Sequence, residues 1–383
     1  MLGCPANGEG SPVECLKNKD ADGKDIFPSS ADTDFGRGWA LEGSTVRVLR
    51  ALTHPNSFWL RSSADGRFAA TGGGAGGGSQ AIDLQATLEG RVRDIKLTGV
   101  SYDPDFFPDN KAFMFQGGAK FCTQNVLERV DNVLFTEPEC TRLTGDGHSA
   151  LYQTVGQTIG DNSIGDRFIL YGNQHANDPG SQVGEDTSAT AGPDSTIQVF
   201  TVVAQGNDDE DGYKTLDDHP ERIPLPYRGD TMMTRSGTVI SSRFGNAEGV
   251  PFGYMIDKLN KQRFGNKYLF TTEPMGTVCM PGNKANFSFD ERFLATHHYT
   301  NASDHDPGDV GYRENGSADI YVADFVTKQK KRITKMAPNQ FALFPHFRSD
   351  GWLYFLVVDK GARKYYVAAS DWAVRQVDAT PTP

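Results

Sequence analysis

The stretch SADGRFAA (residues 63–70) decides the fold, and RSDGWLYF (residues 348–355) repeats its pattern near the end of the chain. Asp-Gly supplies the positive φ that a tight turn needs. The alternating apolar residues that follow predict a strand with one buried face. The same pattern recurs along the chain, clearly in PDNKAFMF (108–115) and SFDERFLA (288–295), and more weakly in GDGHSAL (145–151), PDSTIQV (193–199) and RSGTVI (235–240).

The repeated turns predict a repeat architecture. The residue after the Asp, or its equivalent, falls at positions 66, 110, 147, 195, 237, 291 and 351. A four-stranded propeller blade takes about 40–50 residues. We therefore predict an all-β chain that forms a β-propeller of seven four-stranded blades. Residues 46–49 would complete the last blade as an N-terminal closing strand, which would cover an exposed sheet edge; residues 374–377 are the alternative for that position.

Within this pattern, DIYVAD (residues 319–324) followed by RIT (residues 332–334) and a later Ser-Asp-Gly resembles the repeat unit of TolB-like, WD-repeat-related propellers. The resemblance covers most of residues 45–375 and implies the fold. It implies no single activity, because that family includes translocation scaffolds, peptidase gates and lyases. We expect residues 1–40 to form a polar arm, residues 41–377 the propeller, and residues 378–383 a tail.

The charge and hydropathy of the chain limit the classes of partner that it can bind. The formal net charge is −11, which argues against nucleic acid or an anionic membrane surface as the main partner. A protein, a glycan or a cation is easier to accommodate. No stretch reaches the roughly 18–20 apolar residues of a membrane span. The polar start after Met1 is typical of a mature sequence from which a secretory peptide has been removed.

Five cysteines indicate an oxidising compartment. Cys4 with Cys15, and Cys122 with Cys140, are close enough in sequence to form local disulfides, which leaves Cys279 over. Alternatively, LGC (residues 2–4) resembles the end of a lipoprotein signal, and Cys4 would carry a lipid anchor while Cys15 pairs with Cys279. The expected location is secreted, periplasmic or on the cell surface.

Two acidic stretches have the spacing of a calcium loop. In the first, residues 207–218, the oxygen ligands would be Asn207, Asp209 and Asp211, with Asp218 at position twelve. In the second, Asp20 and Asp22 match, but Ser29 stands where the closing carboxylate belongs. Both stretches lack flanking helical patterns, so a solvated acidic loop is the alternative. If Ca²⁺ binds, we expect it to order loops.

Histidines and aromatic residues supply the remaining candidates. A stretch of thirteen residues contains three carboxylates and three histidines that could bind a transition metal: His297, His298 and His305. Neighbouring residues on a strand point to opposite faces, so His297 and His298 should not share an ion; a polar loop is the alternative. For His346, we expect a packing role. Four aromatic residues near turns could anchor a partner, with about half of them expected in the core: Trp59, Phe106, Phe107 and Trp372.

Hydrolase elbows, zinc-protease motifs and phosphate loops are missing from the sequence, and the glycine run 72–78 is typical of a flexible loop. The sequence therefore favours a non-catalytic propeller that binds a protein or glycan through its loop face. Two alternatives stay open: a metal-assisted polysaccharide lyase or hydrolase that uses Arg292 with the histidines, and a structural subunit of a surface filament or complex.

Overall fold

A computed structural model describes residues 45–52, 57–73, 79–97, 104–115, 120–123, 134–135, 140–142, 151–158, 166–172, 193–204, 213–216, 220–244, 253–265, 267–278, 280, 282–300 and 316–378. Strands dominate these ranges, and two helices accompany them: α1 (Leu84–Leu88) and α3 (Trp372–Asp378). Neither helix has the length and apolar character needed to cross a membrane. The predicted all-β class is confirmed.

The described strands form six antiparallel units of four strands each, and one parallel pairing, Ala318 opposite Phe341, joins the last two units into an eight-stranded sheet. Two short strands lie outside this pattern: β9 (Leu134–Phe135) pairs parallel with β5, and β15 (Ile223–Pro224) pairs with β13. In order from the inner to the outer strand, unit 1 is β2 (Ser57–Ser62), β3 (Phe68–Gly73), β4 (Ser79–Asp83) and β5 (Asp94–Leu97); unit 2 is β6 (Asp105–Phe106), β7 (Ala112–Phe115), β8 (Lys120–Thr123) and β10 (Cys140–Arg142); unit 3 is β11 (Leu151–Gln157), β12 (Arg167–Gly172), β13 (Thr196–Ala204) and β14 (Tyr213–Thr215); unit 4 is β16 (Arg228–Met233), β17 (Val239–Phe244), β18 (Gly253–Phe264) and β19 (Lys267–Val278); unit 5 is β20 (Asn283–Phe287), β21 (Phe293–Thr300), β22 (Ser317–Asp324) and β23 (Gln329–Arg332); unit 6 is β24 (Gln340–Phe347), β25 (Leu353–Asp359), β26 (Lys364–Ser370) and β1 (Val46–Ala51).

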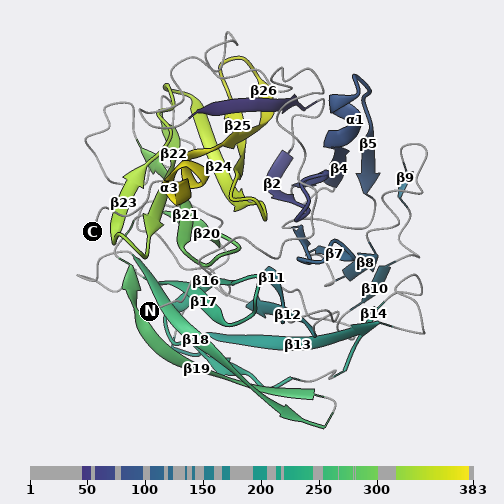
Figure 1. Cartoon of the computed structure of the whole chain (residues 1–383), viewed down its shortest axis with the longest axis vertical. Helices are drawn as coiled ribbons and strands as arrows, with labels where there is room; N and C mark the ends of the chain where they lie inside the picture. Colours follow the sequence, from purple (N-terminus) through teal and green to yellow (C-terminus); the bar gives the residue numbers. More distant parts are fainter. Residues whose placement is uncertain are drawn as a thin grey trace.

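Figure 1 shows the six units following one another around a common centre. The inner strands contact one another in sequence order, and β24 also contacts β2, so the first and last units are neighbours. Apolar side chains fill the space between adjacent units. For example, Phe293 of unit 5 stacks on Phe347 of unit 6, and a buried cluster that includes Leu60 and Leu343 joins units 1 and 6. The core therefore lies between the sheets.

The first of the described strands belongs to the last unit. β1 pairs antiparallel with β26, with Val46 opposite Ser370, as predicted for residues 46–49. The Thr45 N–H also donates to the Asp371 carboxylate at 2.8 Å. The alternative, a strand over residues 374–377, is wrong because these residues lie in helix α3.

Five of the predicted turns share one hydrogen-bond pattern between the first and second strands of a unit. The turn residue (Gly66, Asn110, Gly237, Glu291 or Gly351) has a positive φ. Its N–H donates to the carbonyl three residues earlier. In four turns the preceding aspartate accepts the N–H two residues further on, which explains the recurring Asp: Asp65, Asp109, Asp290 and Asp350.

The prediction of seven blades is not confirmed, because one of the weaker turns does not lie between a first and a second strand and another is not among the described residues. The turn at Ser195 leads into β13, the third strand of unit 3. The turn at Gly147 lies outside the described residues. In unit 3 the first and second strands are joined instead by residues 158–166.

The inner strands also share a β-bulge. Register shifts occur in β2, β11, β16, β20 and β24, in each case a few residues before the turn. In four of them a non-glycine residue with positive φ stands seven positions before the turn residue: Trp59, Asp230, Lys284 and Phe344. A bulge re-aims the side chains of its strand, and here it does so next to the centre of the molecule.

Cys122 and Cys140 lie directly opposite each other in the pairing of β8 with β10. Opposite residues of antiparallel strands have Cα atoms about 4.5–5.5 Å apart, within the range that a disulfide spans. The predicted disulfide is compatible with this register and stays a prediction. Cys4, Cys15 and Cys279 lie outside the described residues, as does the polar arm.

Candidate functional site

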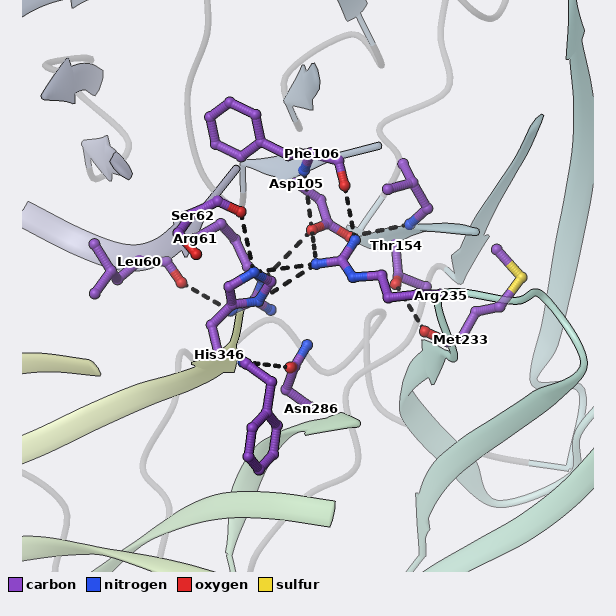
Figure 2. A network of polar contacts seen from close by, with 12 residues as sticks. Leu60, Arg61, Ser62, Asp105, Phe106, Thr154, Met233, Arg235, Asn286 and His346 are labelled. Atoms are coloured by element: carbon purple, nitrogen blue, oxygen red, sulfur yellow. Dashed lines mark hydrogen bonds and ion pairs between the residues drawn. The ribbon is translucent and has the colours of Figure 1, made fainter. Parts of the chain in front are cut away.

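A network of buried polar groups occupies the centre, and every unit contributes to it. We call it the central network (Figure 2). Five of its members are side chains and one is a backbone N–H. They are Arg61 on β2, Asp105 on β6, the N–H of Val155 on β11, Arg235 after β16, Asn286 on β20 and His346 on β24.

Asp105 is the anion of this network. One carboxylate oxygen (Oδ1) accepts a hydrogen bond from Arg235 Nη2 at 2.9 Å. The other oxygen (Oδ2) accepts the N–H of Val155 at 3.0 Å. Arg61 Nε lies 4.0 Å from Oδ1, and the side chains of Arg61 and Asp105 are fully buried. One carboxylate thus holds together groups from units 1, 2, 3 and 4.

Arg235 reaches across the centre from the turn of unit 4. Besides Asp105, its guanidinium donates to the carbonyl of Phe106 at 2.8 Å and lies 3.1 Å from Nε2 of His346. The fixed fork of a guanidinium suits such simultaneous contacts. Arg235 stands two residues before Gly237, and the turn directs its side chain toward the centre rather than toward solvent.

His346 is held in its neutral form. Its Nε2 lies 3.2 Å from the carbonyl oxygen of Ser62, which can only accept, and 3.1 Å from Nη2 of Arg235, which can only donate. Burial, with the charges of Arg235 and Arg61, places the pKa of His346 well below 6.5. A protonated imidazole here would face two guanidinium groups, whereas the neutral ring fits between units 1, 4 and 6.

The four bulge residues form a second layer; Trp59, Lys284 and Phe344 each stand two residues further from the turn than the network residue of the same strand. The Lys284 ammonium bonds to the Asp230 carboxylate and lies 5.0 Å from the centroid of the Trp59 ring. Trp59 in turn packs on Phe344, with ring centroids 4.5 Å apart. A basic group, a carboxylate and two aromatic rings from four different units therefore meet in one layer.

His297 lies against this second layer from β21. Its Nδ1 accepts the N–H of Phe344 at 3.2 Å, so the proton is on Nε2. The pKa of His297 is well below 6.5, mainly because the ring is buried and then because Lys284 and Arg243 are close. Like His346, it is a neutral histidine that holds backbone in place.

The two adjacent histidines point to different neighbours. His297 packs on Phe344 of unit 6, whereas His298 packs on Tyr321 of its own sheet. Both are buried. Within the described residues, no three His, Cys, Asp or Glu side chains gather as a metal site requires. His305 and all six proposed calcium ligands lie outside the described residues: Asp20, Asp22, Asn207, Asp209, Asp211 and Asp218.

The aromatic candidates belong to the core. Phe106, Phe107, Trp59 and Trp372 are all buried, so the prediction that some of them form an exposed anchor is wrong. The physical reason is the fold itself: residues beside these turns lie where neighbouring units pack together. Arg292, named with the histidines, bonds to Asp324 of its own sheet at 2.8 Å and also serves structure.

Sequence reasoning missed the central network, although the sequence holds a signal for it. The residue five positions before each of the five turn residues is buried, and four of these five are polar: Arg61, Asp105, Met232, Asn286 and His346. Aligning the repeats on their turns and reading this column would have shown it, because charged residues in a column of inner strands must face one another. The expected packing role of His346 understates its position between two arginines.

Comparisons with known proteins agree at the level of the fold. No protein-family model matches the chain, and the curated proteins contain no match. Among solved structures the chain is similar to TolB from Acinetobacter baumannii (11% identity, 84% of this chain and 64% of that chain, TM-score 0.42). It is also similar to the Cps50 β-propeller domain from Myceliophteria thermophila (11%, 84% and 99%, TM-score 0.45). A third similar structure is an oligogalacturonate lyase from Vibrio parahaemolyticus (9%, 87% and 94%, TM-score 0.44).

The resemblance to TolB-like and WD-repeat-related propellers is thus a resemblance of fold alone. With identities of 9–11%, similarity of this kind does not carry an activity from one protein to another. The ring arrangement itself rests on the strand pairing and on the contacts between the inner strands.

Proposed function

We propose that this chain is a six-bladed propeller, closed by β1, that acts as a non-catalytic scaffold and binds a protein partner through its loops. The observation that carries the proposal is the burial of the central network: Arg61, Asp105, Arg235 and His346 are all at most 3% exposed. A general acid or base has to reach its substrate within hydrogen-bond distance. These groups instead bond to one another and to the backbone.

The network supports the role of a rigid hub. A buried network of hydrogen bonds and ion pairs favours one relative placement of the elements that carry it. Here the elements are the inner strands of all six units, so the hub favours one arrangement of the ring. A rigid ring that presents variable loops is the usual basis for a binding function.

The connections between second and third strands define the proposed binding end, which we call the loop end. It includes the long connections 173–192 and 301–315, which leave from β12 and β21. The opposite end, which carries the five turns, we call the turn end. Strands within a unit alternate in direction, so a third strand ends at the same end as a first strand. β13 is a third strand, and the chain therefore enters the calcium-loop candidate 207–218 from the turn end. The connection 301–315 and the calcium-loop candidate 207–218 therefore leave their units from opposite ends.

Two exposed positions allow a direct test: Ala362 in the β25–β26 turn at the loop end and Lys111 in the β6–β7 turn at the turn end. A photo-crosslinking amino acid placed at each should give protein adducts in the source cell envelope from position 362 and few from position 111. Adducts from position 111 alone, or from both equally, would contradict a contact surface at the loop end.

Metal content separates the scaffold from a metal-assisted lyase or hydrolase. We propose that any bound metal is Ca²⁺ and that it orders the turn-end segment 207–218, which includes strand β14. Calorimetric titration should then show calcium binding that an Asp209→Asn/Asp211→Asn variant loses. Stoichiometric manganese, zinc or iron that is lost in His305→Ala, together with turnover of an acidic polysaccharide, would instead establish the enzyme and refute the scaffold.

We also propose a secreted or periplasmic location, supported by the opposite placement of Cys122 and Cys140. Mass spectrometry of the unreduced protein, digested with protease, should yield these two cysteines in one linked peptide pair. Free thiols at both positions in protein isolated from its source would contradict an oxidising compartment.

A further inference from the structure

The outer edge of unit 5 carries a concentrated positive charge on an acidic protein. Residues 328–335 hold five cations and no carboxylate, whereas the chain as a whole has a net charge of −11. Strand β23 runs through this segment and pairs with β22. Arg332 is engaged with Asp319, 2.6 Å away. The other four cations are exposed lysines: Lys328, Lys330, Lys331 and Lys335.

β23 is also an open edge. Among the described strands it pairs with β22 alone, so its other side faces outward. Residues 326–331 are all exposed, so none of the segments that the structure describes covers this edge. The outward N–H and C=O groups of such a strand can accept a further strand.

The second exposed edge of this kind, β19 in unit 4, is less suitable. It contains Pro274, which has no N–H to donate, and a bulge opposite it at Ile256/Asp257. Proline and bulges are the usual protection of an edge against pairing. β23 has neither, and its protection consists of lysines alone.

Lysines protect an edge selectively. Two copies of β23 would bring like charges face to face, which disfavours pairing between identical chains. A strand that carries carboxylates meets the opposite charge and is favoured. Since Lys330 and Lys331 point to opposite faces of the sheet, an acidic strand would find a cation on each face.

We propose that β23 binds an extended acidic segment of a partner protein as an added antiparallel or parallel strand. A peptide is favoured over a polyanionic glycan because the edge offers backbone donors and acceptors as well as charge. A glycan can use the lysines but cannot pair with the strand. This surface lies at the rim, apart from the loop end, so its test and that of the proposed scaffold function can fail independently.

The probe is a fluorescein-labelled eight-residue peptide that alternates Glu and Val, and the matched control peptide has Gln in place of Glu. Anisotropy should report binding of the Glu peptide, at least about tenfold weaker binding of the Gln peptide, and weakening with added salt. Lys330→Glu/Lys331→Glu should lose at least about tenfold in affinity, because like charges then face each other. Hydrogen exchange of the β23 amides, Gln329–Arg332, should slow on binding.

The matched variant is Lys96→Glu/Lys364→Glu, which makes the same charge change at exposed positions of units 1 and 6. It should bind the probe as the parent protein does, and circular dichroism should show both variants folded. Three results would each overturn the proposal: no binding of the Glu peptide; binding without amide protection, displaced equally by polygalacturonate; or concentration-dependent self-association that Lys330→Glu/Lys331→Glu removes, which would make a second copy the occupant.

Discussion

Two Arg–Asp pairs of the same chemistry lie in opposite surroundings. At the centre, Arg235 and Asp105 are 2.9 Å apart, with side chains 4% and 0% exposed. At the start of helix α3, Arg375 and Asp371, the residue that precedes the helix, are 2.8 Å apart, with side chains 49% and 9% exposed. The distances are alike, so the difference lies in solvation. Water screens the outer pair, whereas the inner pair has exchanged water for contacts with its neighbours.

The comparison teaches how ion pairs at the centre affect the stability of the protein. Each buried pair adds little stability, but the loss of one partner of a pair is costly. A buried ion pair contributes little net stability compared with apolar packing, but an isolated buried charge is costly. The central network avoids isolated charges by sharing Asp105 between Arg61 and Arg235. The periphery needs no such arrangement.

The largest expected effect is that of removing the central anion. Asp105→Asn leaves Arg61 and Arg235 buried without their carboxylate and should lower the free energy of unfolding by about 3–5 kcal/mol. Asp371→Asn, the matched outer change, should cost less than about 1 kcal/mol. Urea unfolding of both variants measures the difference. Equal losses would show that the centre is hydrated.

A second contrast concerns two glycines in equivalent turns. Both Gly66 and Gly351 have positive φ, so alanine at either position costs about 1–2 kcal/mol in backbone strain. At Gly66 an added Cβ would also lie 2.6 Å from Arg348 Cδ, whereas at Gly351 its nearest neighbour is Val374 at 3.5 Å. Arg348 is itself buried at the seam between units 6 and 1.

Gly66→Ala should therefore lower the free energy of unfolding by about 1–3 kcal/mol more than Gly351→Ala does, because overpacking usually costs this much. Thermal unfolding of the two variants tests this. If their melting temperatures fall equally, Arg348 moves aside without cost, and the seam is less tightly packed than the structure indicates.

Acid should lower the stability of the fold through the buried histidines near the centre. The pKa values of His346 and His297 are depressed in the folded protein, so below about pH 6.5 the unfolded chain binds more protons than the folded one. Stability should therefore fall as pH drops below 6.5, by about 1.4 kcal/mol per pH unit for each histidine.

His346→Gln should reduce that slope by one histidine's share, about 1.4 kcal/mol per pH unit. Chemical unfolding at several pH values between 5 and 7 provides the measurement. An unchanged slope would mean that His346 is protonated in the folded protein, in conflict with its place between Arg61 and Arg235.

Asp319, further out in unit 5, should act in the opposite direction. Burial raises its pKa from 3.8 to about 6 despite its bond to Arg332. As the pH rises, Asp319 loses its proton at a higher pH in the folded protein than in the unfolded chain. Its protonation therefore contributes fully to stability below pH 3.8, and this contribution is lost as the pH rises to about 6. Asp319→Asn should thus make the loss of stability on acidification between pH 6 and 4 steeper. A shallower pH profile would show that Asp319 is ionised throughout.

The turns were predictable from the sequence because their chemistry is local. Asp65 accepts the N–H of a residue two positions away, and Gly66 needs only its own backbone freedom. The same Asp and Gly chemistry also occurs where the chain enters a third strand, as at Ser195. A local pattern cannot tell these two places apart, and the predicted blade count of seven follows from that ambiguity.

The candidate site was not predictable residue by residue, because its members interact over long separations in sequence. Arg235 and Asp105 are 130 positions apart, and His346 and Ser62 are 284 apart. No local pattern marks Arg235 as inward-facing, and a turn residue is ordinarily exposed. Phe106 and Phe107 were misjudged for the same reason: the neighbouring units cover the turn that they flank.

By itself the sequence determined the all-β class, the turns that precede five of the six second strands, and the assignment of residues 46–49 to the last unit. These depend on turn chemistry and on the period of apolar residues, which act over a few positions. Only the tertiary structure decided which residues meet at the centre. Six inner strands must be placed around one axis before Arg61, Asp105 and His346 become neighbours, and burial then gives their charges the consequences that water would otherwise remove.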